Sequence, residues 1–319
     1  MDGGKKKNIV VLGGANGCIV ALRALKRFSD QLDIRAVVSV ADSGGSSGIL
    51  RERYGVLPPS DLMRAVLALS TYDFHFLKEV FVDGRMAEGP FGGHSLGNLF
   101  LTWAANETGD IRHGIRALET ILNAQGHVFP VSLDSIHLAV QLSDGSVVNG
   151  EGKIDRPSYD RSLRIRRAWL EPDGNLNPEA RRVIEHSDML VIGPSSVYTS
   201  AVATLLVRGM SEAIQRTRSP IVFISSTFYN EIAETGPTRL SEQVAEIEQY
   251  LPRPINVVIY DKYAPDEEAA RKAREEKHLV LLEKDPEHIP NHRCLGALLR
   301  DPRDRMSIKK LGEILSACI

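Results

Sequence analysis

The N-terminal part of the chain alternates between short apolar runs and turns of small residues, and this rhythm constrains the fold more than any other feature. The segment NIVVLGGANG, residues 8–17, is an apolar run that ends in a glycine-rich turn. Residues 19–28 then carry apolar side chains at helical spacing, and residues 34–45 form a second apolar run that ends in glycines. A strand, a helix and a strand in this order predict a βαβ unit, which builds parallel sheets through right-handed crossovers.

The middle of the chain has a different pattern before the rhythm returns. Within residues 128–175, apolar and polar residues alternate around an SDG turn, which is typical of an antiparallel hairpin. Strand–helix pairs resume at DMLVIGPSS, residues 188–196, and continue to a last strand, LVLLEKD, at residues 279–285. We predict one Rossmann-like α/β domain over residues 1–319, with a mostly parallel, doubly wound sheet and a small β-rich excursion at about residues 128–175.

Charge and cysteine content argue against several classes of protein. The formal net charge of −2 gives no global attraction to nucleic acid or to an anionic membrane, so we expect neither partner. No run approaches the ~18 uninterrupted apolar residues of a membrane span, and we identify no signal peptide, so we expect a cytoplasmic protein. Cys18, Cys294 and Cys318 lack CxxC spacing, which argues against disulfides and zinc, and Cys18 is expected to be a buried small side chain.

Three predicted strands end in turns of small residues, at residues 13–17, 42–48 and 193–196. Small residues allow backbone N–H groups to approach a ligand, and the N-terminus of a following helix favours an anion. Since parallel strands end at one edge of a sheet, the turns predict a site for a phosphate-bearing ligand. The alternative is that glycine serves only to turn the chain. The first turn, GGANG, matches neither the dinucleotide fingerprint nor the P-loop, which disfavours an NAD-binding oxidoreductase.

Two acidic residues accompany these turns. Asp42 closes the second apolar run just before GGSSG, and Asp61 follows the loop at residues 58–60. A carboxylate beside an anion cradle indicates a divalent cation that bridges carboxylate and phosphate oxygens, so Mg²⁺ at Asp42 and Asp61 is one interpretation. The other interpretation is that both residues cap helices.

The segment FGGHSLGN, residues 91–98, places His94 and Asn98 on one face of a helix. His94 could donate to a phosphate or act as a general acid, and the alternative is a histidine bound to a nearby carbonyl. Residues 93–97 also match the serine-hydrolase pattern G-x-S-x-G. No apolar strand precedes them, as a nucleophile elbow requires, so a hydrolase is disfavoured.

Five ordered segments resemble the gluconeogenesis-factor family, the YvcK-like relatives of CofD, the phospholactate transferase of deazaflavin coenzyme synthesis. The segments are VADSGGSSG, GVLPPSD, GHSLGNLFL, the DG…GE hairpin and IGPSSVYTS, in order within residues 9–260. The resemblance implies a Rossmann-like protein that binds UDP-N-acetylglucosamine, has no settled enzymatic activity, and is linked to gluconeogenic growth, cell-wall synthesis and cell shape. The CofD branch implies instead a magnesium-dependent transferase with a phospholactate-type donor activated by a nucleoside diphosphate.

The turns and the resemblance together imply a set of ligand- or phosphate-binding residues, with Asp42 and Asp61 as metal positions. Arg300 is included because it resembles a late family arginine that contacts the nucleotide sugar. The set is Gly13, Gly14, Asn16, Gly17, Gly44, Gly45, Ser46, Ser47, His94, Asn98, Ser195, Ser196, Tyr198, Thr199 and Arg300.

Several of these positions depart from the family's usual pattern. Ala15 and Asn16 stand in a turn that usually reads GGGTG, and Ser195 replaces a usual glycine. Ser43 replaces an acid, which weakens the metal interpretation, and Ile49 replaces an arginine, which removes a phosphate donor. The preferred hypothesis is a divergent, non-enzymatic nucleotide-sugar-binding regulator whose ligand need not be the usual one, with a CofD-like transferase as the alternative. The oligomeric state stays open, and a homodimer is compatible with the sequence.

Overall fold

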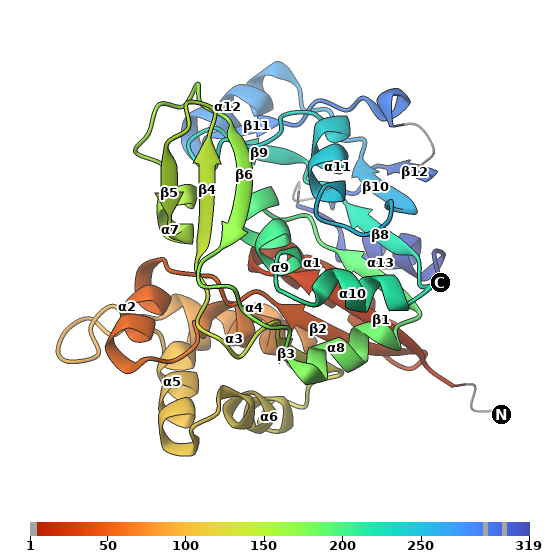
Figure 1. Cartoon of the computed structure of the whole chain (residues 1–319). Coiled ribbons are helices and arrows are strands. Elements are labelled where there is room, and N and C mark those ends of the chain that lie inside the picture. The colour runs from red at the N-terminus through yellow and green to blue at the C-terminus, as the bar shows by residue number, and fades with distance from the viewer. Residues whose placement is uncertain (1–4, 290–292, 302–304) are drawn as a thin grey trace.

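The centre of the molecule is a seven-stranded parallel sheet in the order β12-β10-β8-β7-β1-β2-β3 (Figure 1). The computed structural model describes residues 5–289, 293–301 and 305–319. The result confirms the predicted Rossmann-like, mostly parallel and doubly wound fold. The strands are β1 (Lys7–Gly13), β2 (Leu32–Val38), β3 (His127–Pro130), β7 (Met189–Ile192), β8 (Ile221–Ile224), β10 (Val257–Asp261) and β12 (Arg293–Ala297).

The strand order reverses at β1. From β1 the chain moves outward through β2 to β3, then returns to β7 on the other side of β1 and moves outward again to β12. Leu12 lies opposite both Val37 and Ile192, so β1, β2 and β7 end at the same level. The crevice between the carboxyl ends of β1 and β7 is therefore the topological switch point, where open α/β sheets bind their ligands.

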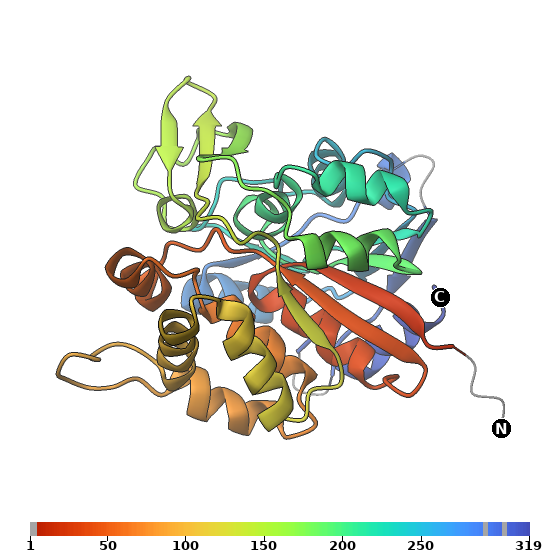
Figure 2. The ribbon, with the colours of Figure 1, turned by 60° about the horizontal axis from the view of Figure 1, so that its bottom comes forward.

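Helices cover both faces of this sheet. α1 (Ala15–Lys26) packs against α3 (Ser60–Leu69) and α13 (Ile308–Ser316), whereas α8 (Pro178–Glu185) packs against α10 (Met210–Arg216). Figure 2 shows α8 and α10 on one side of the sheet and α1 on the other. Strands covered on both faces read as continuous apolar runs, which is why the sequence reveals them readily.

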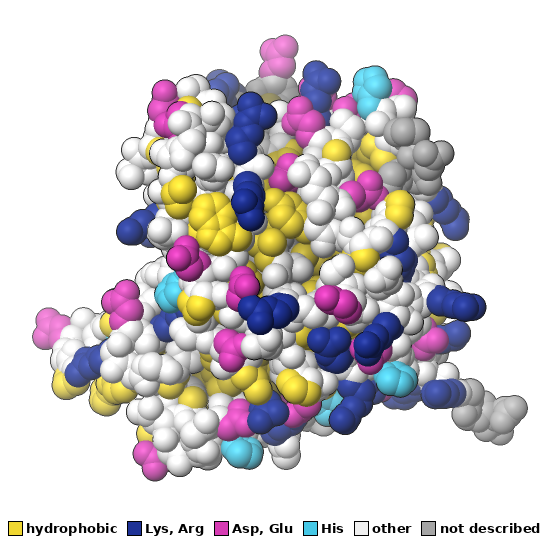
Figure 3. Space-filling view, viewed as in Figure 1, with side chains coloured by type: hydrophobic (Ala, Val, Ile, Leu, Met, Phe, Trp, Pro, Cys, Tyr) yellow, Lys and Arg dark blue, Asp and Glu magenta, His cyan; other side chains and the backbone are white. Residues whose placement is uncertain are grey.

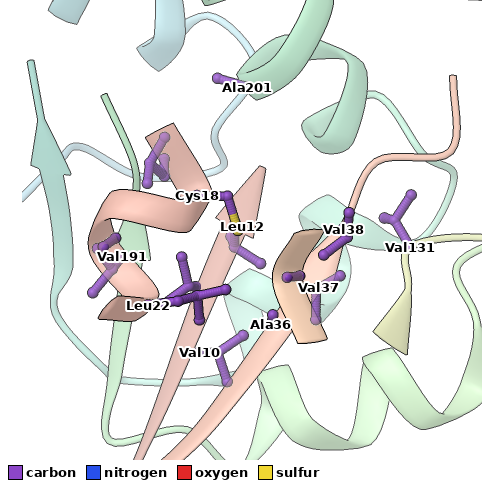
Figure 4. Packing of buried hydrophobic residues seen from close by; sticks show 14 of the residues in the cluster. Val10, Leu12, Cys18, Leu22, Ala36, Val37, Val38, Val131, Val191 and Ala201 are labelled. Carbon is purple, nitrogen blue, oxygen red and sulfur yellow. The ribbon is translucent and has the colours of Figure 1, made fainter. Parts of the chain in front are cut away.

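The core lies between these layers. Val10, Val37 and Leu22 are fully buried, and Cys18 at the start of α1 lies beside Leu12 (Figure 4). Cys18 is 1% exposed, and burial raises the pKa of its thiol. The expectation of a buried small side chain is confirmed.

Further helical segments connect and flank the sheet. Among the helices of the described residues, none combines the length and the apolar character needed to cross a bilayer. On the face shown in Figure 3, Lys and Arg side chains are interspersed with Asp and Glu. The segments are α2 (Gly45–Tyr54), α4 (Phe74–Lys78), η1 (Glu79–Asp83), α5 (Leu96–Thr108), α6 (Ile111–Ile121), η2 (Val197–Val202), α9 (Ala203–Leu205), α11 (Leu240–Glu248), α12 (Glu267–Lys277) and η3 (Pro286–His288).

A three-stranded antiparallel sheet forms the β-rich excursion. Its order is β5-β4-β6, with β4 (Leu138–Leu142), β5 (Val147–Asn149) and β6 (Ile165–Leu170). The short helix α7 (Glu151–Asp155) lies between β5 and β6. Because β3 belongs to the main sheet, the antiparallel strands cover residues 138–170, a narrower range than the sequence predicts.

The last strands differ from the prediction. β11 (Leu279–Leu281), within the predicted strand LVLLEKD, pairs antiparallel with β9 (Phe228–Asn230) and forms a separate two-stranded sheet. The last parallel strand is β12, which pairs with β10. Its sequence, RCLGA, contains a glycine and an alanine, so its apolar signal is weak and the sequence does not reveal it.

Candidate functional site

The three turns of small residues lie at the carboxyl edge of the sheet. β1 ends at Gly13, just before α1, and β2 leads through Asp42 to α2. β7 leads through residues 193–196 to η2. The first N–H groups of a helix have no intrahelical partner, so each turn brings hydrogen-bond donors to this edge.

Glycine lets the first and third turns touch. A Cβ on Gly17 would lie 2.4 Å from the carbonyl carbon of Pro194, and a Cβ on Gly193 would lie 2.7 Å from the oxygen of Gly17. At Gly14, a Cβ would lie 2.6 Å from Asp61 Oδ2. Gly17 and Gly193 are therefore required by backbone packing, independently of any ligand, whereas the nearest atom at Gly14 belongs to a side chain.

The protein's own oxygens already bind N–H groups of these two turns. The N–H of Gly14 donates to Ser200 Oγ at 2.8 Å, and the N–H of Ala15 donates to Asp61 Oδ2 at 2.8 Å. Directly after the third turn, Glu234 accepts the first N–H groups of η2, beginning with Val197 at 2.6 Å. Two carboxylates thus occupy positions at which the sequence predicts a phosphate.

Asp61 connects α3 to the first turn. It lies in the first turn of α3, which has no side-chain cap, so the helix-cap interpretation is wrong for Asp61. Its other oxygen lies 3.7 Å from Arg64, and Arg64 also donates to the side chain of Asn16. Burial and the nearby charge of Asp42 raise the pKa of Asp61, although the Ala15 N–H and Arg64 lower it. One carboxylate oxygen of Asp61 therefore already accepts a hydrogen bond from the first turn.

A cavity of about 770 Å³, which we call the large cavity, lies between the start of α2 and the β-rich excursion. Asp42 and residues 43–47 line one side, and Glu151 and Asp155 of α7 line the other. Charged side chains of both signs gather around it. They are Asp42, Glu52, Arg85, Glu151, Lys153, Asp155, Arg156 and Glu171.

Hydrogen bonds hold the second turn beside α7. Asp42 accepts the N–H of Gly44 at 2.8 Å, but the N-cap of α2 is Gly44, so Asp42 closes a turn and is not the cap. The N–H of Gly152 donates to Ser43 Oγ at 3.1 Å. The Oγ of Ser47 is buried and has no hydrogen-bond partner among the described residues. An unpartnered hydroxyl beside a helix N-terminus leaves a donor and acceptor for a ligand.

The carboxylates that line the large cavity disfavour one another's ionised form. Burial, followed by the charges of Asp42 and Asp155, raises the pKa of Glu151 to about 8. Burial also raises the pKa of Asp155. Within the described ranges, no three His, Cys, Asp or Glu side chains are arranged to hold a metal by themselves. Mg²⁺ usually binds one or two carboxylates together with phosphate oxygens, and Asp42 and Glu151 fit that pattern.

His94 and Asn98 position Ser46 at the start of α2. The amide of Asn98 donates to Ser46 Oγ at 3.0 Å, and Ser46 Oγ lies 2.8 Å from His94 Nδ1. A hydroxyl can accept two hydrogen bonds and donate one, so Ser46 can bind Asn98 and His94 at the same time. Both side chains are buried, and Asn98 also lines the large cavity. His94 therefore binds a hydroxyl, whereas one expectation was a carbonyl.

A second cavity, of about 320 Å³, lies at the topological switch point, and we call it the switch-point cavity. Asn16 and Gly17 line it from the first turn, and Ser195 and Ser196 from the third. The start of α3 lies between the cavities, because Ser60 lines the large cavity while Asp61 binds the first turn. Tyr198 and Thr199 are not among the described residues that line this cavity. Their backbone N–H groups donate to the carboxylate of Glu234.

Arg300 contacts an aromatic residue that lines the switch-point cavity. Its Nε donates to Asp261 Oδ2 at 2.8 Å, and its guanidinium stacks 5.3 Å from the ring centroid of Phe228 and 4.7 Å from that of Tyr263. Phe228 lines the cavity, whereas Arg300 is not among the described lining residues. In this structure Arg300 supports the aromatic wall.

The sequence alone does not single out Glu151, Asp155 or Glu234 as site residues. Glu151 carries a weak signal, because it follows Gly150 directly after the hairpin. Glu234 carries none, because it belongs to an irregular loop between β9 and α11. Only the tertiary contacts bring these carboxylates to the turns.

Known proteins share this architecture along most of the chain. A family model described as 2-phospho-L-lactate transferase CofD matches residues 9–295. A crystal structure of a UPF0052-family protein from Bacillus halodurans superimposes with a TM-score of 0.88 at 31% sequence identity, covering 98% of this chain and 99% of that one.

Relatives named gluconeogenesis factor match along most of the chain. The protein of Halalkalibacterium halodurans is 35% identical over 282 residues, which cover 88% of this chain and 85% of that protein. The protein of Bacillus subtilis is 37% identical over 250 residues, which cover 78% and 76%. These matches confirm the resemblance on which the sequence analysis relies. The chain therefore belongs to the CofD family and to its gluconeogenesis-factor branch.

Proposed function

We propose that the chain binds a phosphorylated ligand of the nucleotide-sugar class, with its phosphate at the start of α2. One observation carries this proposal: residues 44–47 at the start of α2 line the large cavity beside Asp42 and Glu151, and the buried Oγ of Ser47 among them has no hydrogen-bond partner in the described residues. A helix N-terminus attracts phosphate, and a neighbouring hydroxyl and carboxylate complete a phosphate–cation site.

Mg²⁺ is the cation that these residues suit best. Asp42 and Glu151 would hold it together with phosphate oxygens, and the ion would neutralise charge between carboxylate and phosphate. Glu151 accepts the N–H of Ser43 at 3.4 Å, so a second carboxylate lies near Asp42 although the second turn itself carries Ser43.

We further propose a regulatory role in the cytoplasm. The relatives' name supports a link to carbon metabolism. UDP-N-acetylglucosamine is the first ligand to test, and the links to cell-wall synthesis and cell shape rest on the family resemblance.

A CofD-like transferase is the second candidate. The description of the family model favours it. The large cavity also has room at its charged rim, where Arg85, Lys153 and Arg156 could receive an acceptor substrate. A transferase consumes its activated donor, whereas a regulator releases its ligand unchanged.

The test is a thermal-shift and calorimetric screen of UDP-N-acetylglucosamine, GDP, NAD and inorganic phosphate, with and without Mg²⁺. A ligand at 100 times its Kd should add about 2.7 kcal/mol to the free energy of unfolding. The Mg²⁺-dependent part of this stabilisation should disappear in Asp42→Asn. Absence of any shift with uridine nucleotides would refute the nucleotide-sugar proposal, and chromatographic detection of donor turnover would favour the transferase.

A further inference from the structure

The two cavities at the carboxyl edge differ in charge. The large cavity is lined by charged side chains of both signs. Among the described residues that line the switch-point cavity, Glu234 is the one Asp, Glu, Lys or Arg. Its other polar lining comes from uncharged side chains, including Asn16, Ser195, Ser196, Ser226 and Gln243.

Both carboxylate oxygens of Glu234 accept hydrogen bonds from the start of η2, directly after the third turn. Oε1 accepts the N–H groups of Val197 at 2.6 Å and Tyr198 at 3.2 Å. Oε2 accepts those of Tyr198 at 3.2 Å and Thr199 at 3.0 Å. These groups begin the helical residues 197–205, whose N-terminal end carries partial positive charge. Glu234 therefore satisfies the donors and neutralises the charge that would otherwise attract an anion.

The β-rich excursion holds Glu234 in this position. Tyr159 and Thr235 share a hydrogen bond of 3.2 Å between their hydroxyls, and Arg164 Nη1 donates to the carbonyl of Gly236 at 2.7 Å. Arg161 donates to the carbonyl of Ala233. Residues 159–164 thus hold the chain on both sides of Glu234 by hydrogen bonds. These bonds fix the position of the Glu234 carboxylate in the wall of the cavity.

We propose that Glu234 is the specificity-determining residue of the switch-point cavity: it keeps phosphate out and reserves the cavity for an uncharged part of the ligand that carries hydroxyl or amide groups. A phosphate there would meet occupied N–H groups and a like charge, which costs free energy in a partly desolvated site. Serine, asparagine and glutamine side chains can both donate to and accept from a sugar or a base. The proposal rests on the proposed function for its natural ligand.

The first experiment removes the carboxylate. In Glu234→Ala the three N–H groups lose their partner, so inorganic phosphate should bind at an additional site, about tenfold or more tightly than the wild-type chain binds it there. Isothermal calorimetry of each protein with inorganic phosphate measures the number of sites. Glu231→Ala is the matched control, because Glu231 lies in the same loop and pairs with Arg274 without contacting the third turn. It should bind phosphate as the wild-type chain does.

Glu234→Gln keeps the size of the side chain and removes its charge. It should also gain phosphate binding, and it carries the test if Glu234→Ala fails to fold. The uncharged halves of the proposed ligand, uridine and N-acetylglucosamine, are the second probe. At least one should bind the wild-type chain and compete with UDP-N-acetylglucosamine, and Glu234→Gln should retain that binding.

The outcomes distinguish failure of the role proposed for Glu234 from failure of the proposed nucleotide-sugar binding. If the Glu234 variants bind no more phosphate than Glu231→Ala, the specificity role is refuted even where UDP-N-acetylglucosamine binds. Failure of both uncharged halves to bind a chain that binds the whole ligand also refutes it. If Glu234→Ala gains a phosphate site but no nucleotide sugar binds the wild-type chain, the nucleotide-sugar proposal fails. The role of Glu234 in excluding phosphate from the switch-point cavity is then still supported.

Discussion

At the scale of single residues, Ala15 is the most strained position of the first turn. Its φ of +50° lies in the left-handed region, where an L side chain costs about 1–2 kcal/mol and glycine does not. Ala15→Gly should raise the free energy of unfolding by about 0.5–1 kcal/mol, the relief of strain less the added chain entropy of glycine in the unfolded state. Urea titration measures the change, and a less stable variant would contradict it.

Glu151 gives the protein a pH dependence whose sign can be stated. Its pKa rises from the ordinary 4.5 to about 8 on folding, so between these values the folded chain binds more protons than the unfolded chain. The free energy of unfolding therefore falls as pH rises through this range. Glu151→Gln removes the group, so its Tm should fall less than that of the wild-type chain between about pH 5 and pH 9 in Mg²⁺-free buffer.

The matched control is an exposed glutamate of α12, Glu275→Gln, whose Tm profile should follow that of the wild-type chain. Parallel profiles for Glu151→Gln and the wild-type chain would show that the carboxyl group of Glu151 is not perturbed.

At the scale of elements, the contact between the start of α1 and the turn after β7 leaves no room for a side chain. Because a Cβ on Gly17 would overlap the backbone of Pro194 at 2.4 Å, Gly17→Ala must push α1 and the third turn apart. Overpacking of this kind costs about 1–3 kcal/mol. Chemical denaturation should show a loss in that range. An unchanged midpoint would mean that the two turns separate without cost.

The elements differ in how well the sequence predicts them. β1, β2 and β7 are continuous apolar runs because both faces of the sheet are covered, and such runs are readable without a structure. β12, RCLGA, contains no β-branched residue and includes a glycine, so it cannot be read in this way. Asp42 and Ser46 could be assigned to the carboxyl edge because they lie in the segment that leads from β2 into α2. Glu234 could not, since its role depends on a loop meeting a turn about 35 residues away in sequence.

At the scale of the whole molecule, a ligand in the large cavity would join two parts that the chain keeps separate. α2 forms one wall and α7 of the β-rich excursion the other. UDP-N-acetylglucosamine with Mg²⁺ should therefore slow hydrogen exchange in both α2 and α7. α8, which lines neither cavity, is the internal reference and should exchange at an unchanged rate. Protection of α2 without α7 would contradict binding between these walls.

The strand order also determines when the protein can finish folding. β1 has β7 as one of its two neighbours, yet more than half of the chain is synthesised between them. At about 5–20 residues per second, β1 waits roughly ten to thirty seconds for that partner. During this interval its apolar edge is unpaired and can join another chain. From the central position of β1, which builds the switch point, we therefore expect the nascent protein to need protection from aggregation while it is still on the ribosome.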